Sequence, residues 1–487
     1  MKITFRPKIS NNLRRIAANA ASLLASDVIN RATTFALYAL VARSLGAFEF
    51  GQLSLALTLF YTFQILAVAG LKTLVTREVA KHRERTNELL VNGSIVVLAT
   101  ALASMAVLGI FVRLMGYDAS TARVVLLLSA GLIPYALSAI CEAVFQGWER
   151  MRLIAIANIP VNVLKIALSF AVLRMGLGLT WVILLLVGSY VTIVAIEWVI
   201  LLAQITVPKF HFRWRVAFWL VRSTITFLGI DGIIAITGSL NVILLSKFRG
   251  ETDVGLYNAG TQLMVPVSLI YGSIVVSVFP LMCRRYEPTL QGIKRIGERV
   301  IELMLAVALP TTVGLFLLSK TAISVLYGSG LGRATISMQI MVWGLILSAM
   351  TSILGQVLVA SLRERVTLRI VAIDLIVSVV AGAVLIWQFG FVGAAVTALL
   401  TRAVDTYLHY RPVAPLFTPQ VMIAAVWKPA VATGAMVVVY FEMSRHGDFV
   451  AAIGCAVAYT IAFVGLMLVD ANGPKNVKMR YQYLWTD

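Results

Sequence analysis

Residues 89–111 read LLVNGSIVVLATALASMAVLGIF and contain no charged side chain. A stretch of this length can cross the hydrocarbon core of a bilayer as one α-helix, which needs about 20 apolar residues. The basic run KHRER at residues 81–85 precedes it, and other apolar stretches along the chain are bounded in the same way. We therefore predict an all-α polytopic membrane protein of about fourteen transmembrane helices, near residues 16–43, 48–70, 89–111, 124–146, 153–173, 180–203, 224–246, 254–281, 300–319, 334–360, 370–388, 391–409, 424–443 and 449–469.

The composition of the whole chain indicates lipid rather than water as its solvent. Of 487 residues, 60% are hydrophobic and only 13% are charged, and the mean hydropathy is +0.91. A soluble core cannot bury so large an apolar fraction. In hydrocarbon the backbone must satisfy its own hydrogen bonds, which leaves helices, because a closed barrel would show alternating residues in segments of about ten.

Several functional classes are disfavoured by what the sequence lacks. Cys141, Cys283 and Cys455 are scattered without metal-like or disulfide-like spacing. We find no catalytic triad, no phosphate-binding glycine loop and no metal-binding helix motif. We expect neither an enzyme nor a bound metal or cofactor.

The positive charges set the expected orientation. The first apolar stretch, residues 16–41, is too long for a signal peptide and is interpreted as an uncleaved span. Most Lys and Arg residues fall on alternate loops, with the largest clusters in residues 72–85, 209–222 and 284–299. The positive-inside rule then places both termini in the cytoplasm. The net charge of +19 predicts attraction to anionic membrane lipids and requires no nucleic acid.

Two short sequence echoes suggest an internal duplication. RSLG at residues 43–46 matches KFRG at 247–250, and ERMRL at 149–153 matches ERVTL at 364–368. Both echoes are displaced by six predicted helices, an even number, so the two copies should be related by an axis along the membrane normal. The predicted parts are an N-terminal lobe of helices 1–6 (residues 1–203), a C-terminal lobe of helices 7–12 (204–420), and helices 13–14 with a cytoplasmic tail (421–487).

A family resemblance rests on five segments. They are RSLGAFEFGQLSLA at residues 43–56, FQGWERMRLIAI at 145–156, VGLYNAG at 254–260, VLYGSG at 325–330 and GFVGAAV at 390–396. In this order they resemble the polysaccharide or O-antigen flippases of the multidrug/oligosaccharidyl-lipid/polysaccharide exporter superfamily, over roughly residues 16–469.

The resemblance implies a V-shaped, two-lobe transporter that works by alternating access in the bacterial inner membrane. The cargo it implies is an undecaprenyl-diphosphate-linked oligosaccharide destined for polysaccharide export. A polysaccharide polymerase or ligase is a further partner that such a protein would meet.

Charged side chains inside predicted spans are the main candidates for a binding site, because each costs about 2.5–3.5 kcal/mol at mid-bilayer. One face of the first span carries Asp27, Asn30, Arg31, Thr34 and Tyr38. We expect this face to line a substrate cavity. The alternative is that Asp27 and Arg31 only neutralise each other one turn apart.

The fifth span repeats this pattern with Asn158, Asn162, Lys165 and Ser169 on one face. Lys165 has no acid within a turn of its own helix, so it faces either a cavity or a partner on another helix. A diphosphate is the kind of anion that Lys165 and Arg31 can bind, through charge-assisted hydrogen bonds. We therefore expect the anionic headgroup to favour the first lobe.

The second lobe offers amides rather than cations. Asp231 and Asn241 lie on one face of the seventh span, and Asn258 and Gln262 lie on one face of the eighth. Amides donate and accept hydrogen bonds, which suits a hydroxyl-rich sugar. Such polar residues also join helices to one another, and this structural role is the alternative.

Other intramembrane charges are excluded from the predicted site. Arg402 and Asp405 form an i, i+3 pair near a cytoplasmic end and are expected to be structural. Glu142, Glu197 and Asp374 lie close enough to cytoplasmic ends that we expect them to reach water.

Two other functions compete with the flippase. A proton- or sodium-coupled multidrug and toxin exporter needs a titrating carboxylate, for which Asp27 or Asp231 are candidates, but a basic cavity would repel organic cations. A non-transporting scaffold for polysaccharide assembly, or a lipid-modifying enzyme, is the other alternative, but nothing in the sequence resembles a catalytic pocket and most extramembrane loops are too short to form one.

Overall fold

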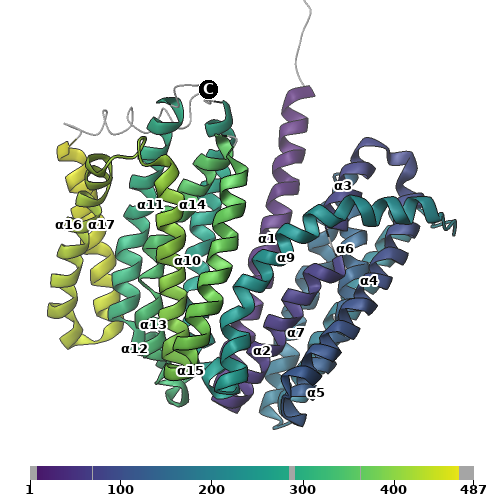
Figure 1. Ribbon diagram of the computed structural model, residues 1–487, viewed down its shortest axis with the longest axis horizontal. Coiled ribbons are helices and arrows are strands. Elements are labelled where there is room, and N and C mark those ends of the chain that lie inside the picture. The colour runs from purple at the N-terminus through teal and green to yellow at the C-terminus, as the bar shows by residue number, and fades with distance from the viewer. Residues whose placement is uncertain (1–7, 69, 285–290, 362, 471–487) are drawn as a thin grey trace, which may run out of the picture. The chain divides into compact units, whose positions relative to one another are not determined.

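The structure is a computed structural model that describes residues 8–68, 70–284, 291–361 and 363–470 (Figure 1). These residues form α-helices and short 3-10 helices without any β-strand, which confirms the all-α prediction. The α-helices are α1 (Lys8–Leu45), α2 (Ala47–Val68), α3 (Leu71–Lys81), α4 (Thr86–Met115), α5 (Ala119–Ser129), α6 (Leu132–Gly147), α7 (Arg152–Arg174), α8 (Leu179–Gln204), α9 (Trp214–Phe248), α10 (Glu251–Arg284), α11 (Gln291–Leu317), α12 (Ser319–Tyr327), α13 (Ala334–Met341), α14 (Gly344–Ala360), α15 (Glu364–Tyr410), α16 (Pro419–Met443) and α17 (Asp448–Asp470). The 3-10 helices are η1 (Arg83–Arg85), η2 (Ser329–Leu331), η3 (Arg411–Val413) and η4 (Ser444–His446).

The number of membrane spans agrees with the sequence prediction. Among the described residues, twelve helical stretches are long and apolar enough to cross a membrane. The longest of them contains Gly390, whose φ of 58° interrupts α15 and divides it into two spans. α1 is also long enough, at 38 residues, although its polar side chains keep it outside this set. With α1 and both halves of α15 counted, the described residues hold fourteen spans, as predicted.

The span predicted near residues 334–360 is two helices, because α13 ends at Met341 and α14 begins at Gly344. The span predicted near residues 124–146 is also two helices rather than one. α5 ends at Ser129 and α6 begins at Leu132. Pro134 lies in the first turn of α6, where it lacks the N–H group that would continue the hydrogen-bond ladder from α5. This proline explains why the two helices are separate although the apolar stretch is continuous.

Residues Met1–Ser239 form the first of two compact units. In this unit α6 packs on α3 and α4, while α7 packs on α1 and α8. A buried apolar core that includes Leu71, Val75, Ile140 and Phe145 joins α3 to α6. Figure 1 shows α3 at one end of the unit and α5 at the other, with the first turns of α9 lying across the α3 end.

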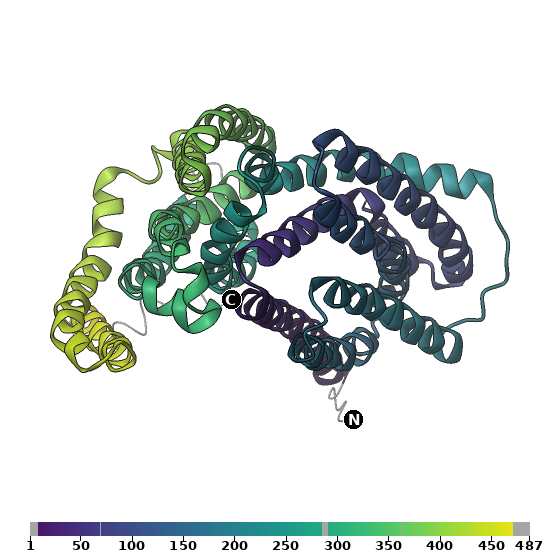
Figure 2. The same ribbon diagram turned by 90° about the horizontal axis from the view of Figure 1, so that it is seen from below.

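Residues Leu240–Asp487 form the second unit. Its core joins α10, α11, α14 and α16, and α17 packs on α16 at the margin of the unit (Figure 2). Buried Lys428 of α16 holds these last helices in place, because its Nζ lies 3.0 Å from Glu302 Oε1 of α11 and 2.6 Å from Asp470 Oδ2 of α17. The boundary between the two units falls after residue 239 of the sequence, inside the continuous helix α9. The sequence predicts a boundary between the lobes near residue 203.

The two glycines of the first sequence echo adopt the same backbone conformation. Gly46 has a φ of +91° and Gly250 a φ of +84°, values that side chains with a Cβ rarely adopt. After Gly250, Asp253 Oδ2 accepts a hydrogen bond of 3.1 Å from the backbone N–H of Phe391, next to the break in α15. The glycine of the first echo therefore has the same left-handed backbone conformation between two helices in each unit.

Substitution of Gly147 tests the close packing of α6 on α3. A Cβ at this position would lie 2.7 Å from Val79 Cγ1 and 3.2 Å from the Ala80 backbone nitrogen. Because the α3 backbone cannot move away freely, we expect Gly147→Ala to lower the free energy of unfolding by about 1–3 kcal/mol. Thermal unfolding of the detergent-purified protein measures this change.

Gly188→Ala in α8 is the matched control, because nothing lies within 4 Å of the added Cβ. It should be neutral or raise stability by up to about 1 kcal/mol through its higher helix propensity. Equal effects of the two substitutions would contradict the packing described here.

Candidate functional site

The first unit contains a polar cavity of about 250 Å³. Side chains from α1, α2, α3, α6, α7 and α8 line it. Six of the residues predicted from the sequence are among them, and these are Asp27, Asn30, Thr34, Asn158, Asn162 and Lys165. The structure therefore brings the polar faces of the first and fifth predicted spans together around one space.

Lys165 projects from α7 as a buried cation, with a relative exposure of 7%. Its Nζ donates a hydrogen bond of 2.7 Å to Asn162 Oδ1. Asn162 Nδ2 in turn donates to the Asn158 carbonyl oxygen at 2.9 Å, which turns the amide oxygen toward the lysine. Within the described part of the chain, no carboxylate forms an ion pair with Lys165. The ammonium group thus faces the cavity with an amide, and not an anion, beside it.

The polar face of α1 is divided between the cavity and the surroundings. Asp27, Asn30 and Thr34 line the cavity, whereas Arg31 is not part of the lining. Arg31 lies 4.0 Å from Asp27, and their side chains are 50% and 71% exposed. An exposed pair of this kind contributes little to stability. The structure thus places Arg31 beside Asp27 and outside the lining to which Lys165 belongs.

A second ion pair in the cavity was not anticipated from the sequence. Lys72 of α3 pairs with Glu142 of α6, and Asn158 Nδ2 donates to the same carboxylate at 3.3 Å. Burial lowers the pKa of Lys72, but the Glu142 carboxylate offsets this and raises the pKa above that of an ordinary lysine. Lys72 therefore stays protonated and neutralises Glu142.

A polar stripe on α6 could have revealed this part of the site. Tyr135, Ser138, Glu142 and Gln146 all line the cavity and fall at i, i+3, i+7 and i+11. This is the helical spacing that identified the faces of α1 and α7. The expectation that Glu142 reaches water rests on its depth near the helix end, whereas this stripe places it in the cavity lining.

The expectation that Glu197 and Asp374 reach water is wrong. Glu197 of α8 is 0% exposed and Asp374 of α15 is 7% exposed. Ser138 Oγ of α6 donates to Glu197 Oε2 at 2.5 Å, while Glu197 Oε1 has no hydrogen-bond partner. Close packing of α6 on α8 covers the carboxyl group, although it lies near a helix end.

The candidate residues of the seventh and eighth predicted spans do not share a cavity with Lys165. Asp231 is exposed on α9. Asn241 Nδ2 donates to the Tyr257 hydroxyl at 3.4 Å, Asn258 is buried with its Nδ2 unpaired, and Gln262 is half-buried. None of these four residues lines the cavity of the first unit.

A smaller cavity of about 210 Å³ lies within the second unit. Tyr257, Thr261, Ser348 and Arg402 are among its lining residues. Arg402 NH1 lies 3.2 Å from Asp405 Oδ2, so the ion pair predicted at i, i+3 is present. Because Arg402 is neutralised in this way, its cavity offers less attraction to an anion than the one that holds Lys165.

A double-mutant cycle tests the Lys72–Glu142 pair. Glu142→Gln leaves half-buried Lys72 without its counterion, and we expect a loss of about 1–3 kcal/mol in the free energy of unfolding. Lys72→Met together with Glu142→Gln should recover part of that loss, because no unpaired charge remains. Strictly additive losses in thermal unfolding would show that the two side chains do not interact.

Comparison with known proteins adds to this geometry. The family model described as polysaccharide biosynthesis protein matches residues 16–285. The chain is 23% identical over 402 residues to the probable low-salt glycan biosynthesis flippase Agl15 of Haloferax volcanii, covering 81% of this chain and 82% of that protein. It is 24% identical over 212 residues to the probable flippase AglR of the same organism, covering 42% and 44% of the two chains.

Solved structures share the fold. The lipid II flippase MurJ, in an inward closed conformation, matches with a TM-score of 0.74 and 14% identity, over 93% of this chain and 99% of MurJ. An inward-facing multidrug resistance transporter of the MATE family matches with a TM-score of 0.65 and 12% identity, over 80% and 96% of the two chains. Since the family model spans more than half of its residues, the chain is a multi-pass membrane protein that belongs to the polysaccharide biosynthesis protein family.

Proposed function

We propose that this protein is a flippase that carries an undecaprenyl-diphosphate-linked oligosaccharide across the bacterial inner membrane by alternating access. Its family and the names of its relatives Agl15, AglR and MurJ support transport of a lipid-linked glycan. The cargo crosses the membrane without covalent change, so the proposed role is not enzymatic. A polysaccharide polymerase or ligase would use the delivered glycan.

The single observation that carries the proposal is the buried ammonium group of Lys165. It faces the cavity of the first unit, and among the described residues its hydrogen-bond acceptor is the Asn162 amide alone. Phosphate oxygens form strong charge-assisted hydrogen bonds with such a group. A diphosphate in this cavity would provide the counterion that the described residues do not.

The rest of the lining suits the sugar next to the diphosphate. Asn158 and Gln64 contribute amides, and Tyr61 and Tyr190 contribute phenol groups. Pockets for small molecules usually measure about 300–1,000 Å³. At about 250 Å³ the cavity matches a headgroup rather than a whole oligosaccharide.

The charges of the cavity argue against export of organic cations. Lys72 neutralises Glu142, and Arg31 lies 4.0 Å from Asp27, which leaves Lys165 as the unbalanced charge among the described residues that line the cavity. The fold shared with MATE transporters does not separate the two functions, because it holds at 12% identity. The sign of the unbalanced charge separates the two functions, since a cation in the cavity repels cationic drugs.

Replacement of Lys165 tests the site in cells. Lys165→Gln keeps the hydrogen-bonding capacity but removes the charge, so we expect translocation to fall at least about tenfold. Lys165→Arg should retain more activity than Lys165→Gln, because the charge persists in a different geometry. The measurement is lipid-linked oligosaccharide held on the cytoplasmic leaflet, alongside the abundance of folded protein in the membrane.

Arg31→Gln is the matched control, because Arg31 lies outside the cavity lining. It should reduce translocation less than Lys165→Gln does. Normal translocation in Lys165→Gln would remove the observation on which the proposal rests.

Cysteine labelling tests the proposed orientation, in which both termini are cytoplasmic. Exposed Arg83 and Arg365 precede spans at the proposed cytoplasmic side, whereas exposed Asp118 and His446 lie in loops at the opposite side. In a Cys283→Ser background, which removes the exposed native thiol, Arg83→Cys and Arg365→Cys should react only from the cytoplasm. Asp118→Cys and His446→Cys should react only from outside, and the reverse pattern would invert the orientation.

A further inference from the structure

The segment that enters α9 exposes large apolar side chains outside the first unit's core. Val207 is 71% exposed, Phe210 is 77% exposed and Trp214 is 72% exposed. Residues 207–225, which we term the interfacial segment, also hold Lys209, Arg213, Arg215 and Arg222 and contain no Asp or Glu. An apolar, aromatic and purely cationic surface of this kind fits neither bulk water nor hydrocarbon alone.

The start of the interfacial segment is clamped to the α3 end of the unit. Asn87 Nδ2 donates to the Lys209 carbonyl oxygen at 3.0 Å, and the Lys209 N–H donates back to Asn87 Oδ1 at 2.8 Å. Asn92 makes a similar pair of bonds, from its Nδ2 to the His211 carbonyl oxygen at 3.3 Å and to its Oδ1 from the Arg213 N–H at 2.8 Å.

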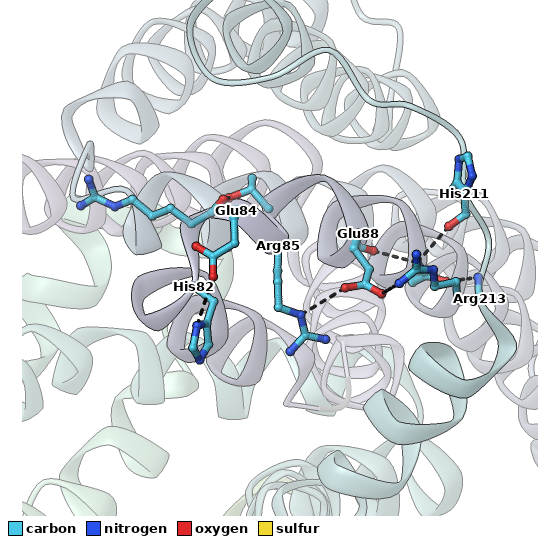
Figure 3. Close-up of polar contacts among 9 residues, drawn as sticks. His82, Glu84, Arg85, Glu88, His211 and Arg213 are labelled. Atoms are coloured by element: carbon cyan, nitrogen blue, oxygen red, sulfur yellow. Dashed lines mark hydrogen bonds and ion pairs between the residues drawn. The ribbon is translucent and has the colours of Figure 1, made fainter.

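An ion pair adds to this clamp. Figure 3 shows Arg85 and Arg213 on either side of Glu88, at 3.1 Å and 2.9 Å from its two carboxylate oxygens. The clamp therefore fixes the direction in which α9 begins. The exposed aromatic side chains are held in place on a defined backbone.

The first turns of α9 have an inner face and an outer face. Ala217, Leu220 and Thr224 are buried at i, i+3 and i+7 and hold the helix against the unit. The outer face carries a stripe of exposed apolar side chains at i, i+4, i+7 and i+11: Trp214, Phe218, Val221 and Ile225.

Two arginines flank this apolar stripe. Arg215 and Arg222, seven residues apart, are both exposed on another side of the helix. In Figure 1 these turns lie across the end of the unit instead of running along its spans. A helix with one apolar and one basic exposed side, lying across the ends of spans, is typical of the membrane interface.

We propose that the interfacial segment binds the anionic phospholipid surface of the leaflet at the α3 end of the first unit. Its aromatic side chains lie at headgroup depth, and Arg215 and Arg222 bind lipid phosphates. The absence of acids from the segment matches the negative charge of such a surface. This binding is independent of the cargo, and it holds the N-terminal part of the helix that continues into the second unit.

The test compares lipid retention by the full-length protein in detergent, measured by native mass spectrometry with added phosphatidylglycerol or phosphatidylcholine. The wild-type protein should retain phosphatidylglycerol preferentially. The double variant Arg215→Gln, Arg222→Gln should bind it about tenfold more weakly, because two cations near the lipid surface are lost.

Arg113→Gln, Arg123→Gln is the matched control. These two arginines are also exposed but lie at the α5 end of the unit. Their removal should therefore weaken phosphatidylglycerol binding by less than half the fold-change seen with Arg215→Gln, Arg222→Gln. Equal losses in both double variants, or equal retention of the two lipids by the wild-type protein, would overturn the proposal. Equal losses of affinity would mean that phosphatidylglycerol binding depends on the overall charge of the protein and not on Arg215 and Arg222.

Tryptophan quenching locates the lipid. In nanodiscs that contain phosphatidylglycerol with brominated acyl chains as a minor component, the wild-type protein should lose more fluorescence than Trp214→Phe does. Brominated phosphatidylcholine at the same fraction should give a smaller difference. No difference between wild type and Trp214→Phe would place Trp214 away from the lipid, as a protein partner on this surface would, and would contradict the proposal.

Discussion

The cost of an ionised group in hydrocarbon decides where the charges of this chain lie. On an insertion scale that cost is about 2.5–3.5 kcal/mol for one side chain at mid-bilayer, so buried charges need partners. Lys72 has Glu142, and Lys428 has Glu302 at 3.0 Å. Lys165 has only an amide oxygen at 2.7 Å among the described residues, although it is buried like Lys428 and more deeply than Lys72. Its missing counterion is the strongest indication of a ligand in the first unit.

This charge balance also gives the proposed transport a physical basis. A binding site for an anionic headgroup must keep a cation available, so that cation must not form an ion pair with a carboxylate of the protein. The hydrogen bonds from Lys165 to Asn162 and from Asn162 to the Asn158 carbonyl keep the ammonium group oriented toward the cavity. The nearby Glu142 is already satisfied by Lys72 and by Asn158. In the proposed site the positive charge of Lys165 is left to bind an anionic cargo. The described carboxylates of the cavity already have cationic partners, so they attract a cationic drug less.

Hydropathy alone was enough to predict where the chain forms membrane-spanning helical stretches, because each span must satisfy its own backbone hydrogen bonds in lipid. Even the break in α15 at Gly390 was predicted, between apolar stretches ending near 388 and beginning near 391. The separation of α5 from α6 was not, since the apolar stretch continues through the break. Helix existence follows from composition, whereas interruptions depend on single residues such as Pro134.

The candidate site was only partly predictable. Helical spacing found the faces of α1 and α7, including Asp27 and Lys165, because a polar stripe on an apolar helix is visible in one segment. The pairing of Lys72 with Glu142 joins two segments about seventy residues apart, which periodicity within one helix cannot detect. Glu197 was misjudged for a similar reason, since its burial depends on Ser138 of another helix. Contacts between helices are what the sequence alone leaves undetermined.

Calorimetry with farnesyl diphosphate as the probe tests most directly whether Lys165 binds a diphosphate, as we propose. The purified full-length protein should bind farnesyl diphosphate more tightly than farnesyl monophosphate. Lys165→Met should weaken binding of the diphosphate by at least about tenfold, because a charge-assisted hydrogen bond is lost. Undiminished binding by a folded Lys165→Met protein would contradict the account.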